Sequence, residues 1–147
     1  MDDNVVAESP DASDDTRRAA NLARFEAVLA TISRGEYEQL REHITEDLVF
    51  DLPYGPDFMP NPIMGLEPWL EMSRMTFAMF RSFGLELTEV HPCLAPDELV
   101  AEYRSDAVVA RNGKAYRNRY IGVVRFRDGK ICAWREFHNP EATKVLA

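Results

Sequence analysis

Two short turn motifs constrain this chain more than any other feature of its sequence. Asn112-Gly113 and Asp128-Gly129 are dipeptides of the kind that adopt the positive φ angles of tight hairpin turns. They separate three runs in which apolar and polar residues alternate, at positions 98–110, 115–127 and 130–139. The sequence therefore predicts three consecutive antiparallel strands joined by hairpins.

The half of the chain that precedes these strands is predominantly helical in pattern. Between Thr16 and Gly35, apolar residues recur at three- and four-residue steps, and Gly35 suits a helix C-cap. We also expect a short helix at 36–43, a strand at 48–52, a helix at 65–83 and a strand at 85–91. Helices that precede an antiparallel sheet indicate an α+β fold, in which the N-terminal helices cover one face of a curved sheet.

Length and composition favour one domain with an acidic N-terminal tail. The chain has 147 residues, of which 46% are hydrophobic, and this suffices for a single core. Residues 1–15 lack periodicity and carry six of the acidic residues without a basic one. We therefore expect a disordered acidic tail at 1–15 and one domain at 16–147.

Charge and hydropathy argue against several kinds of partner. The net charge is −8, and no basic stripe of the kind that binds a phosphate backbone is present, so we expect no nucleic acid. No apolar run approaches the about 20 residues that cross a bilayer, and the acidic N-terminus does not resemble a signal peptide. We expect a cytoplasmic protein that binds no membrane.

Cys93 and Cys132 lack metal-ligand spacing, so we expect reduced thiols and no metal.

Alternation along the predicted strands sorts side chains onto two faces. Tyr103 and Ser105 share the apolar side of the first strand, opposite Arg104 and Asp106. In the next strand the apolar side carries Tyr116, Asn118 and Tyr120, and in the last it carries Trp134, Glu136 and His138. Asn118 and Glu136 are thus polar groups in an apolar setting, where they must be hydrogen-bonded or functional. Alternation alone leaves open whether Arg104 and Asp106 form a structural ion pair or a catalytic one.

Two further segments carry aromatic and sulfur-containing residues of ambiguous role. The segment Pro53–Pro62 contains four prolines and is predicted to be an irregular loop, in which Tyr54 and Phe58 either cap a pocket or pack on the helices. In the helix predicted at 65–83, Trp69 and Met72 lie on an apolar stripe. Such a stripe is typical of a core and also suits the wall of an adaptable pocket.

The segment YRNRYIGVVRFRDGKICAWREFHNP, Tyr116 to Pro140, is similar to sequences of the phenazine-biosynthesis A/B proteins. From about Thr16 to Pro140 the chain resembles SnoaL-like proteins of the nuclear transport factor two-like superfamily. This resemblance implies a cone-shaped α+β fold, a homodimer formed through the outer face of the sheet, and a hydrophobic small molecule as ligand. It implies no cofactor.

Three branches of this superfamily can be compared residue by residue. The resemblance to ketosteroid isomerases places Leu52 where their general base stands and Arg119 near their oxyanion-hole acid, which argues against that reaction. Limonene epoxide hydrolases carry charged residues that resemble Arg104, Asp106 and Glu136, but their water-positioning residues correspond to Phe50 and Leu52 here. The phenazine-type proteins use a glutamate that corresponds to Glu136, and a histidine that corresponds to Met72. Both of the latter comparisons imply that Arg104, Asp106 and Glu136 point into one pocket.

The resemblance and the residues together predict an enzyme without a cofactor that acts by acid/base chemistry on an aromatic or polycyclic substrate. Glu136 is the expected acid/base and Arg104 the residue that orients Asp106 or the substrate, because one carboxyl beside an arginine stays ionised while the other tends to be protonated. His138 is either a second proton carrier or a packing residue. The alternatives are a non-catalytic binding or scaffold protein and an epoxide hydrolase. The expected ligand contacts are Asn118, Tyr116, Tyr120, Trp134, His138, Tyr54, Trp69 and Met72.

Overall fold

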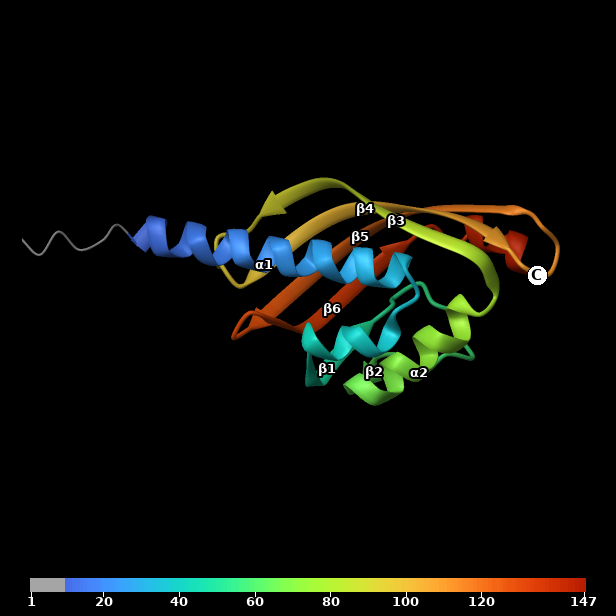
Figure 1. The fold of residues 1–147 in the computed structure, drawn as a ribbon, viewed down its shortest axis with the longest axis horizontal. Helices are drawn as coiled ribbons and strands as arrows, with labels where there is room; N and C mark the ends of the chain where they lie inside the picture. The colour runs from blue at the N-terminus through green and yellow to red at the C-terminus, as the bar shows by residue number, and fades with distance from the viewer. Residues whose placement is uncertain (1–9) are drawn as a thin grey trace, which may run out of the picture.

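The computed structural model describes residues 10–147 (Figure 1). The side chains are described from Ser13 onward. In this part of the chain the helical segments are α1 (Pro10–Ser33), η1 (Tyr37–Glu42), α2 (Leu66–Phe77) and η2 (Ala142–Leu146). The strands are β1 (Ile44–Asp51), β2 (Ile63–Met64), β3 (Phe80–Pro92), β4 (Glu98–Val109), β5 (Ala115–Arg127) and β6 (Lys130–His138). The predicted α+β class is confirmed.

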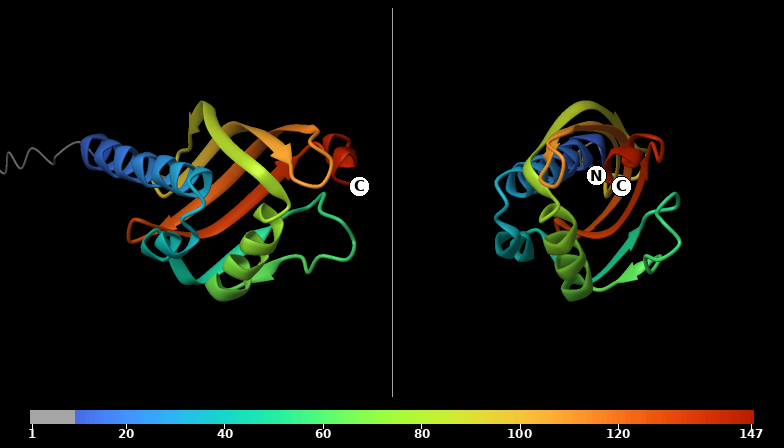
Figure 2. Two further views of the ribbon diagram at one scale, coloured as in Figure 1. Left: turned by 45° about the vertical axis from the view of Figure 1, so that its right-hand side comes forward. Right: turned by 90° about the vertical axis from the view of Figure 1, so that its right-hand side faces the viewer.

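The strands form one open sheet in the order β2-β1-β6-β5-β4-β3. β1 and β6 run parallel, and the other neighbouring strands are antiparallel. The long strands curve around the side of the sheet on which α1 lies (Figure 2). The sheet does not close into a barrel, so β2 and β3 are left as its edges.

The predicted meander of β4, β5 and β6 is confirmed, and its turns explain why. Asp128 and Gly129 have φ angles of 52° and 77°, and Gly113 has a φ of 70°, as tight hairpin turns require. Between these turns β5 alternates exposed and buried residues along its whole length. A strand whose faces are this well distinguished fixes its register, because a slip of one residue would exchange the two faces.

Two helix boundaries differ from prediction. α1 begins at Pro10, so residues 10–15 of the predicted tail are helical, while residues 1–9 lie outside the described part. α2 ends at Phe77 instead of Phe83, and β3 begins at Phe80. Phe80 and Phe83 pair with Val109 and Ala107 of β4, and the Phe80 ring lies 5.3 Å from that of Tyr116 in β5, so contacts within the sheet favour the strand.

Both α-helices pack against the same face of the sheet. The Phe25 ring of α1 lies edge-on to Tyr103 and Trp134, at centroid distances of 5.6 and 5.5 Å. Trp69 of α2 lies 6.1 Å from the Trp134 ring. We call this face, which carries the buried side chains of Tyr103, Tyr120 and Trp134, the inner face, and the opposite one the outer face.

Two expectations about the chain as a whole can be compared with the described residues. Cys93 and Cys132 are both free thiols, as predicted. Among residues 10–147, no helix combines the length and the apolar character that a membrane span needs.

Candidate functional site

Glu136 is a partly buried carboxyl on the inner face, near the end of β6. The hydroxyl of Tyr103 donates a hydrogen bond to its Oε2, and the indole Nε1 of Trp134 donates to the same hydroxyl over 3.2 Å. Burial raises the pKa of Glu136 to about 7, although the hydrogen bond from Tyr103 opposes the shift. A carboxyl with such a pKa exists in both protonation states near neutral pH and can take up or release a proton.

Gly122 makes room for this group of side chains. It lies directly opposite Glu136 in the β5–β6 ladder. A Cβ atom at this position would lie 3.0 Å from the Trp134 Nε1 and 3.1 Å from the Tyr103 hydroxyl. Because glycine has no side chain, residues of β4 and β6 meet above β5.

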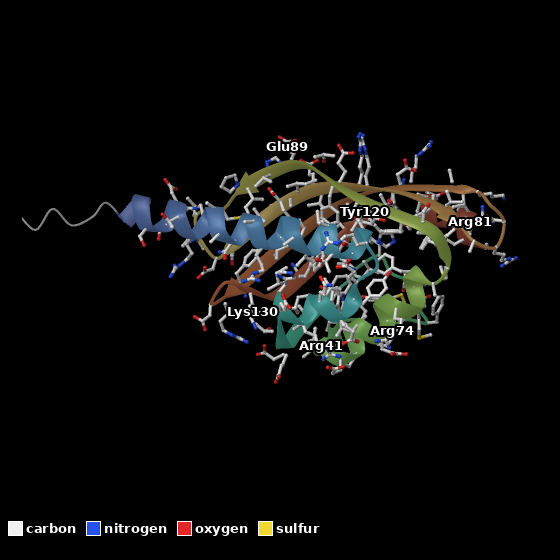
Figure 3. The ribbon with its side chains drawn as sticks, viewed as in Figure 1. Arg41, Arg74, Arg81, Glu89, Tyr120 and Lys130 are labelled. Atoms are coloured by element: carbon white, nitrogen blue, oxygen red, sulfur yellow. The ribbon has the colours of Figure 1, made fainter. Side chains whose placement is uncertain are left out.

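A second polar group lies on the inner face beside Glu136. The Tyr103 and Tyr120 rings stack at 5.2 Å, and Tyr120 donates a hydrogen bond to Ser105 Oγ over 3.0 Å. The Tyr116 and Tyr120 hydroxyls are 3.3 Å apart. Figure 3 shows Tyr120 in the interior, whereas the labelled Glu89 and Lys130 lie at the periphery. We call Ser105, Tyr120 and Tyr116 the hydroxyl chain.

Asn118 holds both ends of the hydroxyl chain. Its Nδ2 donates to the Tyr116 hydroxyl over 2.8 Å, and its backbone N–H donates to Ser105 Oγ over 3.1 Å. The orientation of the amide is fixed, since Oδ1 accepts from the backbone N–H groups of Arg119 and Asn139, and Nδ2 also donates to the Asn139 carbonyl. All four hydrogen-bonding positions of the Asn118 amide are therefore used within the protein.

His138 extends the inner-face group by one step along β6. It pairs with Tyr120 across the ladder, and burial lowers its pKa, which favours the neutral imidazole. Its Nδ1 is buried and has no hydrogen-bond partner among the described residues. A ligand or a water molecule can satisfy this atom.

Arg104 and Asp106 do not join Glu136. Both side chains lie on the outer face, where Arg104 binds Glu86 at 2.9 Å and Asp106 binds Arg117 at 3.4 Å. The expectation that Arg104, Asp106 and Glu136 share a pocket is wrong. The reason is the two-residue period of a strand, which places 104 and 106 opposite the buried Tyr103 and Ser105.

The other predicted ligand contacts fall into different places. Trp69 and Trp134 are core residues that contact each other and Phe50. Met72 is partly buried against the same core and accepts a hydrogen bond from Thr76 at its sulfur. Tyr54 is 59% exposed and its ring lies 5.9 Å from that of Phe137, so it packs against β6 at the surface.

A hollow of about 880 Å³ crosses the charged part of the sheet. The charged residues that line it, Glu86, Arg104, Asp106, Arg117 and Arg119, are all exposed on the outer face. Tyr103 and Glu136 are not among its lining residues. Ser105, Asn118 and Asn139 also line it, so the hollow extends from the outer face to one end of the hydroxyl chain, but it does not include Glu136.

Sequence reasoning missed Tyr103 and Ser105 as site residues. Alternation placed both on the apolar side of β4, but nothing in the sequence shows that Tyr103 reaches a carboxyl 33 residues away. The available signal is Gly122, a strand glycine between two strands that carry large polar side chains.

Comparison with known proteins decides the family. Residues 23–134 match the family profile of the SnoaL-like domain. The chain belongs to the SnoaL-like family. It is 28% identical over 99 residues to the uncharacterised protein YesE of Bacillus subtilis, a match that covers 67% of each protein. It is 30% identical over 98 residues to an uncharacterised PhzA/B-like protein of Pseudomonas aeruginosa, covering 63% of this chain and 64% of the relative.

The solved structures similar to this SnoaL-like domain include an NTF2-like protein from Anabaena variabilis, with a TM-score of 0.69 and 25% identity, covering 82% of this chain and 87% of the other. A crystal structure of a candidate isomerase from Bacillus subtilis superposes with a TM-score of 0.80 and 25% identity, covering 88% of this chain and 94% of the other. A phenazine biosynthesis-related protein from Pseudomonas aeruginosa gives 0.75 at 19% identity, covering 92% and 89%. IdmH, a proposed polyketide cyclase from Streptomyces antibioticus, gives 0.72 at 19% identity, covering 86% and 96%. These likenesses confirm the predicted fold family.

Proposed function

We propose that this SnoaL-like protein is a cofactor-independent enzyme that moves a proton on a hydrophobic small molecule, with Glu136 as the proton carrier. The observation that carries the proposal is the position of Glu136, a partly buried carboxyl on the inner face whose Oε2 is held by the Tyr103 hydroxyl. Its raised pKa supports a role as base and acid in turn. The names of the structural relatives, a candidate isomerase and a proposed cyclase, agree with such chemistry.

One carboxyl suffices for this type of reaction. Ionised Glu136 removes a proton from a carbon next to a carbonyl group, and the C–H electron pair becomes the C=C bond of an enolate. Where the substrate carries a second C=C bond conjugated with the enolate, the protonated carboxyl returns the proton to the far carbon of that bond and the double bond shifts, which is an isomerisation. In a ring closure, the enolate carbon attacks a second carbonyl carbon, and the carboxyl protonates the resulting alkoxide. Tyr103 acts as a positioning residue because it fixes one carboxyl oxygen.

The structure does not bring together the residues on which the prediction of epoxide hydrolysis depended. That prediction used Arg104, Asp106 and Glu136 as one cluster, and the first two lie on the outer face. A binding protein without catalysis is then the main competitor, and it requires no proton transfer at Glu136.

Exchange of carbon-bound hydrogen tests the proposal without knowledge of the natural substrate. 1-Tetralone is incubated with the protein in D₂O at pH 7.5, and deuterium incorporation next to the carbonyl is followed by NMR. We expect the wild-type protein to accelerate exchange over buffer, and Glu136→Gln to lower this rate about 100-fold or more. Asp106→Asn is the matched control, since it removes a carboxyl from the outer face, and its rate should stay within about twofold.

The outcomes separate catalysis from binding. Equal rates for the wild-type protein and Glu136→Gln would exclude Glu136 as the proton carrier. Binding of 1-tetralone to the wild-type protein without accelerated exchange would favour the non-catalytic alternative.

A further inference from the structure

Trp134 is a core residue whose indole N–H serves a polar purpose. The side chain is 2% exposed, and its Nε1 donates to the Tyr103 hydroxyl over 3.2 Å. An indole N–H can donate a hydrogen bond but cannot accept one. The Tyr103 oxygen therefore accepts from Trp134, and its single hydrogen remains for the Oε2 of Glu136. We call this directed series of donors, from Trp134 through Tyr103 to Glu136, the indole relay.

Packing fixes both donors of the indole relay independently of the carboxyl that they serve. The Tyr103 ring stacks on Tyr120 at 5.2 Å, and the Trp134 ring lies 5.6 Å from Phe50. A Cβ atom at Gly122 would lie 3.0 Å from the Trp134 Nε1 and 3.1 Å from the Tyr103 hydroxyl, so the two polar atoms meet in the space that this glycine leaves. Neither ring can turn away without disturbing the core.

We infer that Trp134 is a positioning residue for proton transfer at Glu136, because its indole N–H directs the Tyr103 hydroxyl to Oε2 and leaves Oε1 to meet the substrate. The inference rests on the proposed function. Among the described residues no side chain or backbone group donates a hydrogen bond to Oε1, whereas Oε2 accepts one from Tyr103. Since Glu136 is only partly buried, its free oxygen is the one available to a bound molecule.

The indole relay also acts on the proton affinity of Glu136. Burial raises the pKa of Tyr103, and the hydrogen bond from Trp134 lowers it, so the phenol becomes a stronger donor. A stronger donor favours the ionised carboxylate. The other titratable groups nearby are the Tyr120 phenol on β5 and His138, two residues further along β6. No charged side chain of the described residues contributes to the pKa of Glu136.

Selective ¹⁵N labelling of tryptophan tests the indole relay in the unaltered protein. The chain has two tryptophans, so a spectrum of Trp69→Phe assigns both indole N–H signals. In a pH titration we expect the Trp134 signal to move with the same midpoint as the carboxyl of Glu136, and this movement to vanish in Glu136→Gln. The Trp69 signal is the internal reference, because its indole donates no hydrogen bond among the described residues.

Replacement of the indole tests the effect on proton transfer. In Trp134→Phe, which keeps an aromatic ring but loses the N–H, the midpoint of Glu136 should rise by about 0.5 pH units. The pH at which deuterium exchange into 1-tetralone reaches half of its plateau should rise equally. Trp69→Phe is the matched control, since it makes the same change in the same core, and its midpoint should stay within about 0.2 pH units of the wild-type value.

The outcomes separate a positioning role from a structural one. An unchanged or lowered midpoint in Trp134→Phe, an equal rise in Trp69→Phe, or a Trp134 indole signal that does not respond to Glu136 would overturn the inference. If Trp134→Phe does not fold, the titration of the indole signal in the wild-type protein and in Glu136→Gln decides alone. A raised midpoint without accelerated deuterium exchange in the wild-type protein would leave the indole relay standing and overturn only the proposed function.

Discussion

The two faces of strand β4 differ in how far their charged and polar side chains are exposed to solvent. On the outer face Arg104 and Asp106 are exposed and meet Glu86 and Arg117 in ion pairs. On the inner face Tyr103 is 2% exposed and its hydroxyl reaches Glu136. Water screens the outer pairs, so they contribute little to stability.

The comparison separates Glu136, a carboxyl without a cationic partner, from the paired carboxyls of the outer face. Glu86 and Asp106 are each neutralised by an arginine, as in many solvated sheet surfaces. Glu136 is held by a phenol instead, and burial raises its pKa. A carboxyl that is costly to ionise is the one able to exchange protons near neutral pH, and this cost should appear in the stability of the fold.

The largest expected effect is a pH-dependent destabilisation that Glu136 causes. Its pKa is about 7 in the folded protein against an ordinary 4.5, so the folded state binds the proton more tightly. The protonated carboxyl therefore stabilises the folded state fully below pH 4.5, and this stabilisation is lost as the pH rises through 7. The free energy of unfolding falls by about 3 kcal/mol over this range. Urea unfolding from pH 4 to 9 should therefore show Glu136→Gln gaining on the wild-type protein as the pH rises. Parallel stability curves would contradict an inner-face position for this carboxyl.

A smaller effect is expected from two strand glycines on opposite faces. An added methyl group at Gly122 would press on Trp134 and Tyr103, so Gly122→Ala should lower the free energy of unfolding by about 1 to 3 kcal/mol. At Gly84, opposite Asp106, a Cβ would meet only a backbone oxygen at 3.6 Å. Gly84→Ala should therefore change stability by less than about 0.5 kcal/mol. Thermal unfolding of both variants measures the contrast, and equal losses would refute it.

The smallest effect is expected for the outer-face ion pairs. Arg104→Gln removes the partner of Glu86, and both side chains are more than half exposed. We expect the free energy of unfolding to change by less than about 0.5 kcal/mol, and the change to shrink in 0.5 M NaCl. A loss comparable to that of Gly122→Ala would mean that the outer face is not simply solvated.

The sequence predicts the sheet well wherever turn chemistry limits it. The bounds of β5 agree with prediction because Asn112-Gly113 and Asp128-Gly129 fix both of its ends. The end of α2 was not predictable in the same way, since the run from Ala78 to Phe83 contains helix-compatible apolar residues and no breaker. Its strand state depends on pairing with β4, which is a tertiary contact.

The candidate site shows how alternation and resemblance differ as evidence. Alternation placed Arg104 and Asp106 opposite Tyr103, and the structure confirms this. The resemblance compares residue types with those of relatives but does not show on which face of the sheet each residue lies. It therefore grouped Arg104 and Asp106 with Glu136. The contact between Tyr103 and Glu136 depends on the strand order β6-β5-β4 and on the space above Gly122, which no local pattern encodes.

Direct titration of Glu136 tests the central claim most directly. The side-chain carboxyl carbon, labelled with ¹³C, is followed by NMR from pH 3 to 10 and assigned by comparison with Glu136→Gln. We expect a midpoint near the pKa of about 7 that burial produces, and a higher midpoint in Tyr103→Phe, because the lost hydrogen bond no longer favours the ionised form. A midpoint near 4.5 that is unaffected by Tyr103→Phe would show a solvated carboxylate and contradict the acid/base role of Glu136.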